Sequence, residues 1–300
     1  MKLNLVVQGA NVETTALKRL AKLSGASGIE QPAPDVFRLP GAAPSNEIEA
    51  LCAQAALDWA FVPEGRRLAD FRLLVMDMDS TLITIETIDE LADFVGQKAT
   101  VAAITAQAMR GEIEYDESLR RRVAVLRGLD EKVLDEVYRE RVRLSPGAEQ
   151  LIAGVKKAGI RILLVSGGFT HITDRLAEDL GIHRSRANSL EIVDGKLTGK
   201  VLGDVVDRAG KARALREFAA DLGVPQAATV AIGDGANDLD MLEAAGLGIA
   251  YNARPVVREL ADTTLNVPYL DAILYLLGIS REEIEAADAA DGIVTPAPPI

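Results

Sequence analysis

From Phe71 onward, short apolar runs alternate with helical stretches, and this alternation constrains the fold more than any other feature. Five runs are rich in valine, isoleucine and leucine: "FRLLVMD", "IRILLVS", "AATVAIGD", "GLGIAY" and "DTTLNV". Stretches with helical character, such as "SPGAEQLIAGVKKAG" and "GKARALREFAADLG", separate most of them. Apolar strands that alternate with helices indicate βαβ units. We therefore predict an α/β fold with a doubly wound parallel sheet, to which "SLEIVDGKLTGKVL" adds a hairpin that turns at Asp194-Gly195.

Three further segments flank or interrupt this pattern. Between the first two runs, about residues 84–144 are helical throughout and predict a cap over the strand ends, with Thr87 and Glu90 as a capping box at its start. Residues 1–70 combine strand-like "LNLVVQG", "DVFRLP" and "FVP" with two helical stretches, which indicates a small α+β, ferredoxin-like domain. We expect Trp59 to pack at its seam with residues 71–285. The small, acidic, proline-rich residues 286–300 indicate a disordered tail.

Composition excludes several classes of function. The chain has 300 residues and a net charge of −12, which argues against a nucleic-acid surface or an anionic membrane surface as partner. No apolar stretch reaches the roughly 18 residues of a membrane span. Cys52 is the single cysteine, so no disulfide framework is expected, and a reducing cytoplasm fits. We expect a small-molecule substrate, and an anionic one would need local cations.

Polar residues follow three of the predicted strands. Asp77 and Asp79 end the first strand, Ser166-Gly167-Gly168 end the second, and Asp234 begins "DGAND" after the third. Ligands bind beyond the carboxyl ends of strands in open α/β sheets, so these groups should meet in one site. Carboxylates there suit Mg²⁺, and a hydroxyl with glycine amides suits a phosphate. Asp77 could then attack phosphorus while Asp79 serves as general acid and base.

Four ordered segments resemble a known family. "DMDST", "SGG", the lysine of "AGKARAL" and "GDGAND" are similar to the motifs of the haloacid-dehalogenase (HAD) phosphatase superfamily. Their spacing, with a helical insert after the first, resembles the phosphoserine phosphatase family in particular, over roughly residues 71–280. The resemblance implies a Rossmann-like HAD sheet, a Mg²⁺ cofactor and an aspartyl-phosphate intermediate.

The resemblance also implies roles for individual residues. Asp77 would be the nucleophile and Asp79 the acid and base. Mg²⁺ would bind Asp77, the backbone carbonyl of Asp79, and Asp234. Asp238 would reach the ion only through a water molecule, or would contact the residues that bind it. The phosphoryl group would be bound by Ser166, Gly167, Lys211 and Asn237. Judged from the sequence pattern alone, Lys211 reads as a surface lysine and Asn237 as a helix cap.

Residues of the predicted cap would select the substrate. By resemblance, Glu86 binds an amino group and Arg122 a carboxylate, while Met109 and Tyr115 form the wall of the pocket. Some relatives carry phenylalanine where this chain has Tyr115. A zwitterion needs one anion and one bidentate cation held apart, which agrees with this assignment. The ordinary alternatives are a helix-start acid for Glu86, an exposed arginine for Arg122 and core packing for Met109.

The resemblance implies hydrolysis of O-phospho-L-serine to L-serine and phosphate, the last step of serine biosynthesis. Two other enzyme hypotheses stay open at this point: transfer of the phosphoryl group to homoserine, and hydrolysis of another small phosphomonoester. A non-enzyme hypothesis is an amino-acid-sensing module, because residues 1–70 resemble ACT-like regulatory domains. The sequence also leaves a homodimer open.

Overall fold

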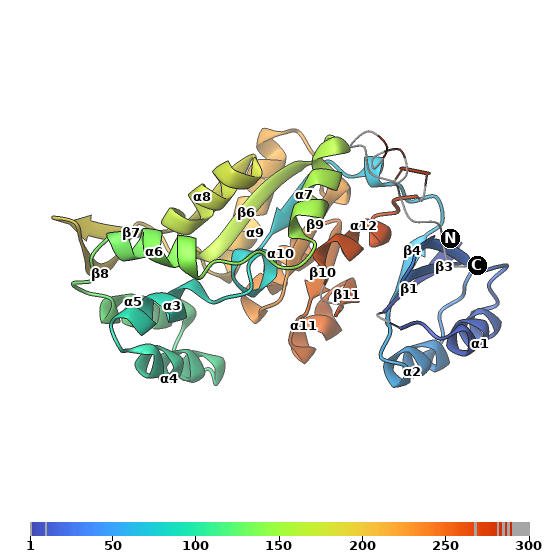
Figure 1. The fold of residues 1–300 in the computed structure, drawn as a ribbon, viewed down its shortest axis with the longest axis horizontal. Helices are drawn as coiled ribbons and strands as arrows, with labels where there is room; N and C mark the ends of the chain where they lie inside the picture. The colour runs from blue at the N-terminus through green and yellow to red at the C-terminus, as the bar shows by residue number, and fades with distance from the viewer. Residues whose placement is uncertain are drawn as a thin grey trace.

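The computed structural model describes residues 2–9, 11–266, 269–280, 282, 283, 286 and 289. They form a seven-stranded and a four-stranded sheet, each with helices packed on it (Figure 1). The α/β prediction is confirmed. Apart from residues 286 and 289, the tail predicted over 286–300 lies outside the described residues.

The larger sheet contains the five predicted strands in parallel orientation. Its order is β11-β10-β9-β5-β6-β7-β8, and only β8 runs antiparallel to its neighbour. The predicted hairpin joins β7 to β8, with φ of 51° at Asp194 and 73° at Gly195. The strands are β5 (Leu73–Met76), β6 (Arg161–Phe169), β7 (Arg184–Val193), β8 (Lys196–Leu202), β9 (Thr229–Gly233), β10 (Leu247–Tyr251) and β11 (Thr263–Leu265).

Helices cover both faces of this sheet, as a doubly wound fold requires. Side chains alternate along the central strand β5: Leu74 and Met76 pack toward one set of helices, Leu73 and Val75 toward the other. All four are fully buried, which explains why this strand is apolar at every position. The first set is α7 (Ala148–Lys157), α8 (Thr170–Leu180) and α12 (Ile273–Leu276); the second is α9 (Arg208–Asp221) and α10 (Leu239–Ala244), with α11 (Pro255–Leu260) next to it.

A group of four helices precedes α7 between β5 and β6, where about four were predicted. They share a core with Phe169 and with Leu197 and Val201 of β8. The chain segments that enter and leave this group of helices pair antiparallel with each other, since Thr84 N–H donates to the Arg143 carbonyl (2.9 Å) and Ser145 N–H to the Leu82 carbonyl (2.9 Å). The bounds are α3 (Thr87–Phe94), α4 (Lys98–Met109), α5 (Tyr115–Val125) and α6 (Lys132–Glu140). The proposed cap limits of about 84–144 stay a prediction.

The predicted capping box at the start of α3 is wrong. Glu86 occupies the N-cap position and makes no side-chain capping bond. The Thr87 hydroxyl donates to Asp79 instead (3.2 Å), and Glu90 pairs with Lys98 and Arg141. Partners at least eight residues away therefore replace the local capping partners.

The N-terminal sheet has the order and helix placement of a ferredoxin-like sandwich. Its antiparallel order is β2-β3-β1-β4, with α1 and α2 on one face. The other face packs against the large sheet's core on the side of α7, α8 and α12, through Val6, Val36, Ala60 and Val62. The bounds are β1 (Leu3–Gln8), α1 (Thr14–Ser24), β2 (Glu30–Ala33), β3 (Val36–Pro40), α2 (Asn46–Gln54) and β4 (Asp58–Pro63). The domain limits at residues 70 and 285 stay a prediction.

Trp59 does not pack at the seam, contrary to expectation. Neighbouring residues of a strand point to opposite faces of the sheet, and Ala60 and Val62 take the seam side. Trp59 therefore points toward α1 and α2, where it meets Phe61 edge-on at 5.9 Å between ring centroids.

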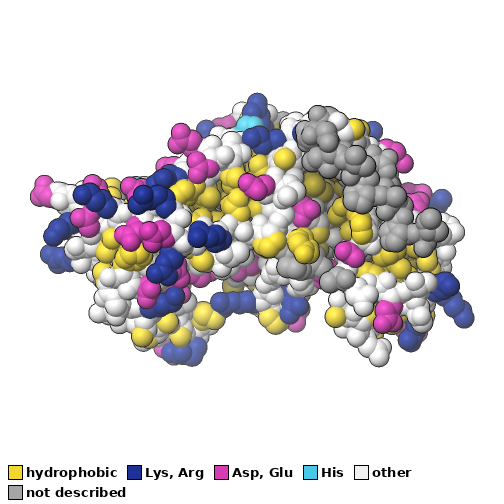
Figure 2. Space-filling model, viewed as in Figure 1, with side chains coloured by type: hydrophobic (Ala, Val, Ile, Leu, Met, Phe, Trp, Pro, Cys, Tyr) yellow, Lys and Arg dark blue, Asp and Glu magenta, His cyan; other side chains and the backbone are white. Residues whose placement is uncertain are grey.

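Charged side chains of both signs lie on the visible face of the molecule (Figure 2). Lysine and arginine side chains are interspersed with aspartate and glutamate on the face shown in Figure 2, without a continuous basic area there. Among the described residues, no helix is both long and apolar enough to cross a membrane.

Candidate active site

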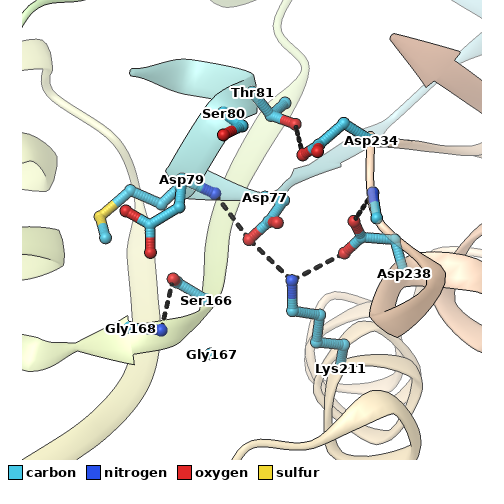
Figure 3. A network of polar contacts seen from close by, with 12 residues as sticks. Asp77, Asp79, Ser80, Thr81, Ser166, Gly167, Gly168, Lys211, Asp234 and Asp238 are labelled. Atoms are coloured by element: carbon cyan, nitrogen blue, oxygen red, sulfur yellow. Dashed lines mark hydrogen bonds and ion pairs between the residues drawn. The ribbon is translucent and has the colours of Figure 1, made fainter. Parts of the chain in front are cut away.

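Three strand ends converge as the sequence predicted. Asp77 follows β5, Ser166 and Gly167 lie at the end of β6, and Asp234 follows β9 (Figure 3). One carboxylate oxygen each from Asp77, Asp234 and Asp238 lie within 4.8 Å of one another. Oxygen donors this close, from partly or fully buried acids, fit a hard divalent cation.

Asp77 is held so that one oxygen is fixed and the other is left available. Its N–H completes the sheet by donating to the Ile232 carbonyl (3.0 Å). Its Oδ1 accepts from Met78 N–H (2.7 Å) and from Lys211 Nζ (2.7 Å). Within the described residues Oδ2 takes part in no hydrogen bond. This is the oxygen that can attack an electrophile or bind a cation.

Lys211 is the buried cation that organises the acids. It projects from α9, is 0% exposed, and bridges Asp77 to Asp238 Oδ1 (2.7 Å). The surface position suggested by the pattern alone is therefore wrong. Burial by itself lowers the pKa of Lys211, but the carboxylates of Asp238 and Asp77 outweigh this effect and raise it above its ordinary value.

Asp238 and Thr81 hold the remaining acids in place. Both oxygens of Asp238 are engaged, one with Lys211 and the other with Gly235 N–H (3.0 Å). The Thr81 hydroxyl donates to Asp234 Oδ1 (2.9 Å), as Figure 3 shows. Burial, and then the charge of Asp238, raises the pKa of Asp77 well above its ordinary value and that of Asp234 to about 7. A bound cation would favour the ionised forms of both.

Asp79 has the properties of a general acid. Its two oxygens accept from the N–H (3.1 Å) and the hydroxyl of Thr87. Burial, followed by the neighbouring charge of Glu86, raises the pKa of Asp79 to about 8. A carboxyl group with this pKa carries a proton at neutral pH and can donate it.

The backbone after Asp79 turns sharply and sets the position of Glu86. Ser80 adopts φ of 56°, a left-handed conformation that is uncommon for a residue with a side chain. Its hydroxyl donates to Glu86 Oε1 (2.7 Å). The turn thus connects Asp77 and Asp79 to Glu86, the residue at the N-terminal end of α3.

The absence of a side chain at Gly167 lets a tyrosine hydroxyl lie against the backbone. A Cβ atom there would stand 2.1 Å from Tyr115 Oη, and one at Gly168 would stand 2.9 Å from Asp79 Oδ2. The fully buried Ser166 accepts from Gly168 N–H through its Oγ (2.8 Å), so its own proton remains available for a ligand.

A cavity of about 400 Å³ lies between the sheet and the inserted helices. Its lining brings together ten of the eleven residues predicted to form the site. Lys211 is the exception, because it lies beneath the cavity floor in contact with Asp77. The ten are Asp77, Asp79, Glu86, Met109, Tyr115, Arg122, Ser166, Gly167, Asp234 and Asn237.

The comparisons with known proteins bear on this arrangement. Residues 74–243, more than half of the chain, match the family model described as haloacid dehalogenase-like hydrolase. The chain belongs to this family. Residues 5–48 match a second model, described as a domain of unknown function, DUF4072.

Named relatives of this HAD-like hydrolase are phosphoserine phosphatases. That of Streptomyces coelicolor is 59% identical over 80% of this chain and 59% of its own length. The match thus spans less than two thirds of that relative. That of Albidiferax ferrireducens is 52% identical over 70% of this chain and 91% of its own. The solved structure of a probable phosphoserine phosphatase from Vibrio cholerae, unliganded, superposes with a TM-score of 0.78 at 34% identity, over 96% of this chain and 88% of its own.

Several residues of the HAD-like site were missed from the sequence. Thr81 and Thr87 position the acids, while Asp89, Ser118 and Arg254 line the cavity. Thr81 is the last residue of the "DMDST" segment and Thr87 lies six residues after it, so their proximity to the acids was a usable signal. Ser118 lies one helical turn before Arg122, whose Nε donates to the Ser118 carbonyl (3.4 Å). No comparable signal marks Arg254.

The raised carboxyl pKa values predict how stability depends on pH without metal. Asp79 and Asp234 bind protons more tightly in the folded HAD-like hydrolase than when unfolded, so proton binding stabilises the fold. This stabilisation is complete below the unfolded pKa near 3.8 and is lost as pH rises through about 7 to 8. Denaturant titrations in chelator should therefore show a free energy of unfolding that falls between about pH 5 and 8.

Two variants and a cation provide the controls. Asp79→Asn and Asp234→Asn should each flatten the pH dependence, because each removes one titrating group. A divalent cation should restore stability most at the alkaline end. A stability that rises over this range in both the parent and the variants would contradict the assignment.

Proposed function

We propose that this chain is a Mg²⁺-dependent phosphomonoester hydrolase that converts O-phospho-L-serine to L-serine and phosphate. One observation carries the proposal: Asp77, with one oxygen fixed by Lys211, shares a cavity with Glu86 and Arg122. The proposed nucleophile thus opens into the same cavity as an acid at the start of the inserted helices and a guanidinium on α5. The names of the relatives support the same substrate.

The substrate's two ends would be recognised by different parts of the structure. Arg122 would bind the carboxylate through its planar guanidinium, and Glu86, oriented by Ser80, would accept from the ammonium group. The Ser166 hydroxyl and the backbone N–H of Gly167 would bind phosphoryl oxygens. Tyr115, beside Gly167, and Met109 would close the cavity around the short carbon chain.

In the first step, Asp77 Oδ2 attacks phosphorus and forms an aspartyl-phosphate. The bond from phosphorus to the serine oxygen breaks, and the protonated Asp79 gives its proton to that oxygen, so that neutral serine alcohol leaves. Lys211 keeps Asp77 Oδ1 fixed during attack. Asp77, the backbone carbonyl of Asp79, and Asp234 would hold Mg²⁺, which when bound supplies positive charge against the phosphoryl oxygens.

In the second step, water attacks phosphorus and the bond from phosphorus to Asp77 breaks. Asp79, now ionised, accepts the proton from the water, which returns both acids to their starting states. Asn237 lines the cavity beside Asp234 and would orient the phosphate or the water. Water enters only after serine has left, which favours hydrolysis when no second alcohol fills the cavity.

A panel of phosphomonoesters, assayed with and without chelator, tests the proposal. We expect L-phosphoserine to be turned over with the highest kcat/KM, chelator to abolish the activity, and added Mg²⁺ to restore it. Appearance of phosphohomoserine when homoserine is supplied would favour the phosphotransferase instead. A preference for another ester would contradict the proposed substrate.

Arg122→Ala should raise KM for L-phosphoserine about 10- to 100-fold, because a charge-assisted hydrogen bond contributes about 1.5–3 kcal/mol. The same change should have little effect on p-nitrophenyl phosphate, which has no carboxylate. Arg121→Ala is the matched control, since Arg121 pairs with Glu117 on the outer side of the same helix and does not line the cavity. Equal effects of both variants would remove Arg122 from substrate recognition.

A further inference from the structure

The charges that line the cavity are unfavourable for an anion that approaches from solvent. The chain carries a net charge of −12, and an ester with a doubly ionised phosphate is itself strongly negative. Among the described lining residues, only Arg122 and Arg254 are cationic. The acids that line the same cavity are Asp77, Asp79, Glu86, Asp89 and Asp234. Entry of an anion therefore depends on where the two arginines lie.

Arg254 lies at the rim of the cavity, on the side of the large sheet. It precedes α11, and its N–H donates to the Asp234 carbonyl (3.4 Å), which fixes its backbone beside the acid cluster. Its side chain is exposed and reaches across to α4, where Nη1 contacts Met109 Sδ (3.3 Å). Met109 is itself 60% exposed, so this contact bridges the two sides of the entrance.

Among the residues that the structure describes, Met109 is the only hydrogen-bond partner of the Arg254 guanidinium, and it is a weak one. A thioether sulfur is a poor acceptor, whereas a guanidinium carries five N–H donors. Within the described residues Arg254 forms no ion pair, although acids outnumber bases in the chain. Arg120 and Arg121, by contrast, each pair with a carboxylate four residues earlier on α5. Arg254 thus keeps its charge available to an incoming anion.

We infer that Arg254 is an entry residue, whose positive charge at the cavity rim draws the anionic phosphomonoester toward Asp77 and Asp234. Met109 holds the guanidinium across the entrance through a contact weak enough to yield to a charged oxygen. Arg122 lies on the inserted helices and serves the bound substrate, so the two arginines act at successive stages. The inference rests on the proposed function only in requiring an anionic phosphate ester.

Steady-state kinetics of Arg254→Gln at several ionic strengths tests the inference, with the full chain and Mg²⁺. Arg258→Gln is the matched control, because Arg258 lies on α11, contacts Asn266 (3.5 Å) and does not line the cavity. At low salt we expect Arg254→Gln to lower kcat/KM about 3- to 10-fold with kcat little changed. Near 1 M salt, where the screening length falls to about 3 Å, the difference should shrink to less than about twofold.

Arg254→Lys should retain most of the low-salt kcat/KM, because it keeps the charge. A loss that persists at high salt, a loss of kcat rather than kcat/KM, or an equal loss in Arg258→Gln would each overturn the inference. Both L-phosphoserine and p-nitrophenyl phosphate should be assayed, with inhibition by inorganic phosphate as a third readout. If only p-nitrophenyl phosphate is turned over, the proposed substrate fails while the comparison of the arginine variants still decides the role of Arg254.

Discussion

Asp77→Asn should abolish phosphate release from L-phosphoserine, with a loss of roughly 10³- to 10⁶-fold in kcat. The amide oxygen of asparagine cannot form the aspartyl-phosphate, so the intermediate that water hydrolyses in the second step does not form. The fold should survive, because Asp77 is a buried acid whose pKa is raised by burial and by the charge of Asp238. Removing the negative charge of Asp77 relieves its repulsion with Asp238, while Lys211 retains its bond to Asp238.

Two measurements separate loss of chemistry from loss of structure. The free energy of unfolding of Asp77→Asn should equal or exceed that of the parent. Asp240→Asn is a suitable control, since Asp240 pairs with Arg208 at the surface and does not line the cavity. Near-normal turnover by Asp77→Asn would remove Asp77 as the nucleophile.

Lys211→Met should destabilise the chain by about 3–5 kcal/mol, the loss observed when one partner of a buried ion pair is removed. Lys211 is fully buried between Asp77 and Asp238, so its removal leaves two buried carboxylates without a compensating cation. Denaturant titration in chelator measures the effect. Activity should fall as well, because Asp77 Oδ1 loses one of its two fixed donors.

A second substitution tests whether the cost comes from the uncompensated acids. In an Asp238→Asn background, Lys211→Met should cost less, because one of the stranded charges is already gone. Lys200→Met is the control, since Lys200 is largely exposed and should change stability by less than about 0.5 kcal/mol. If Lys211→Met cost no more than Lys200→Met, the buried ion network would have no role in stability.

The parallel sheet and most of the site could be predicted because they follow from local pattern. Apolar runs place Asp77 and Asp234 at strand ends, and the rule that such ends share one edge brings the two acids together. The sequence spacing alone suggested Lys211 as a surface residue, since its helix shows no sign of the two acids that bury it. Only the family resemblance predicted that Lys211 lies in the site with the acids.

The expectations that failed, and the cavity residue that no motif marks, depend on contacts that a local sequence pattern does not show. Thr87 looked like a local helix cap, but its hydroxyl binds Asp79, which is eight residues earlier. Trp59 was placed on the wrong face of its strand, because the sequence did not show which face would meet the large sheet. Arg254 reaches Met109 across 145 positions of sequence, and no short motif marks such a contact.

The most direct test of this account is to stop the reaction with L-phosphoserine and Mg²⁺ in acid and to map the phosphoryl group by peptide mass spectrometry. We expect the peptide that contains Asp77 to carry it, and the Asp77→Asn variant to carry none. A phosphoryl group on another residue would contradict covalent catalysis by Asp77. So would an unmodified Asp77 peptide in samples that were quenched during steady turnover and kept in acid.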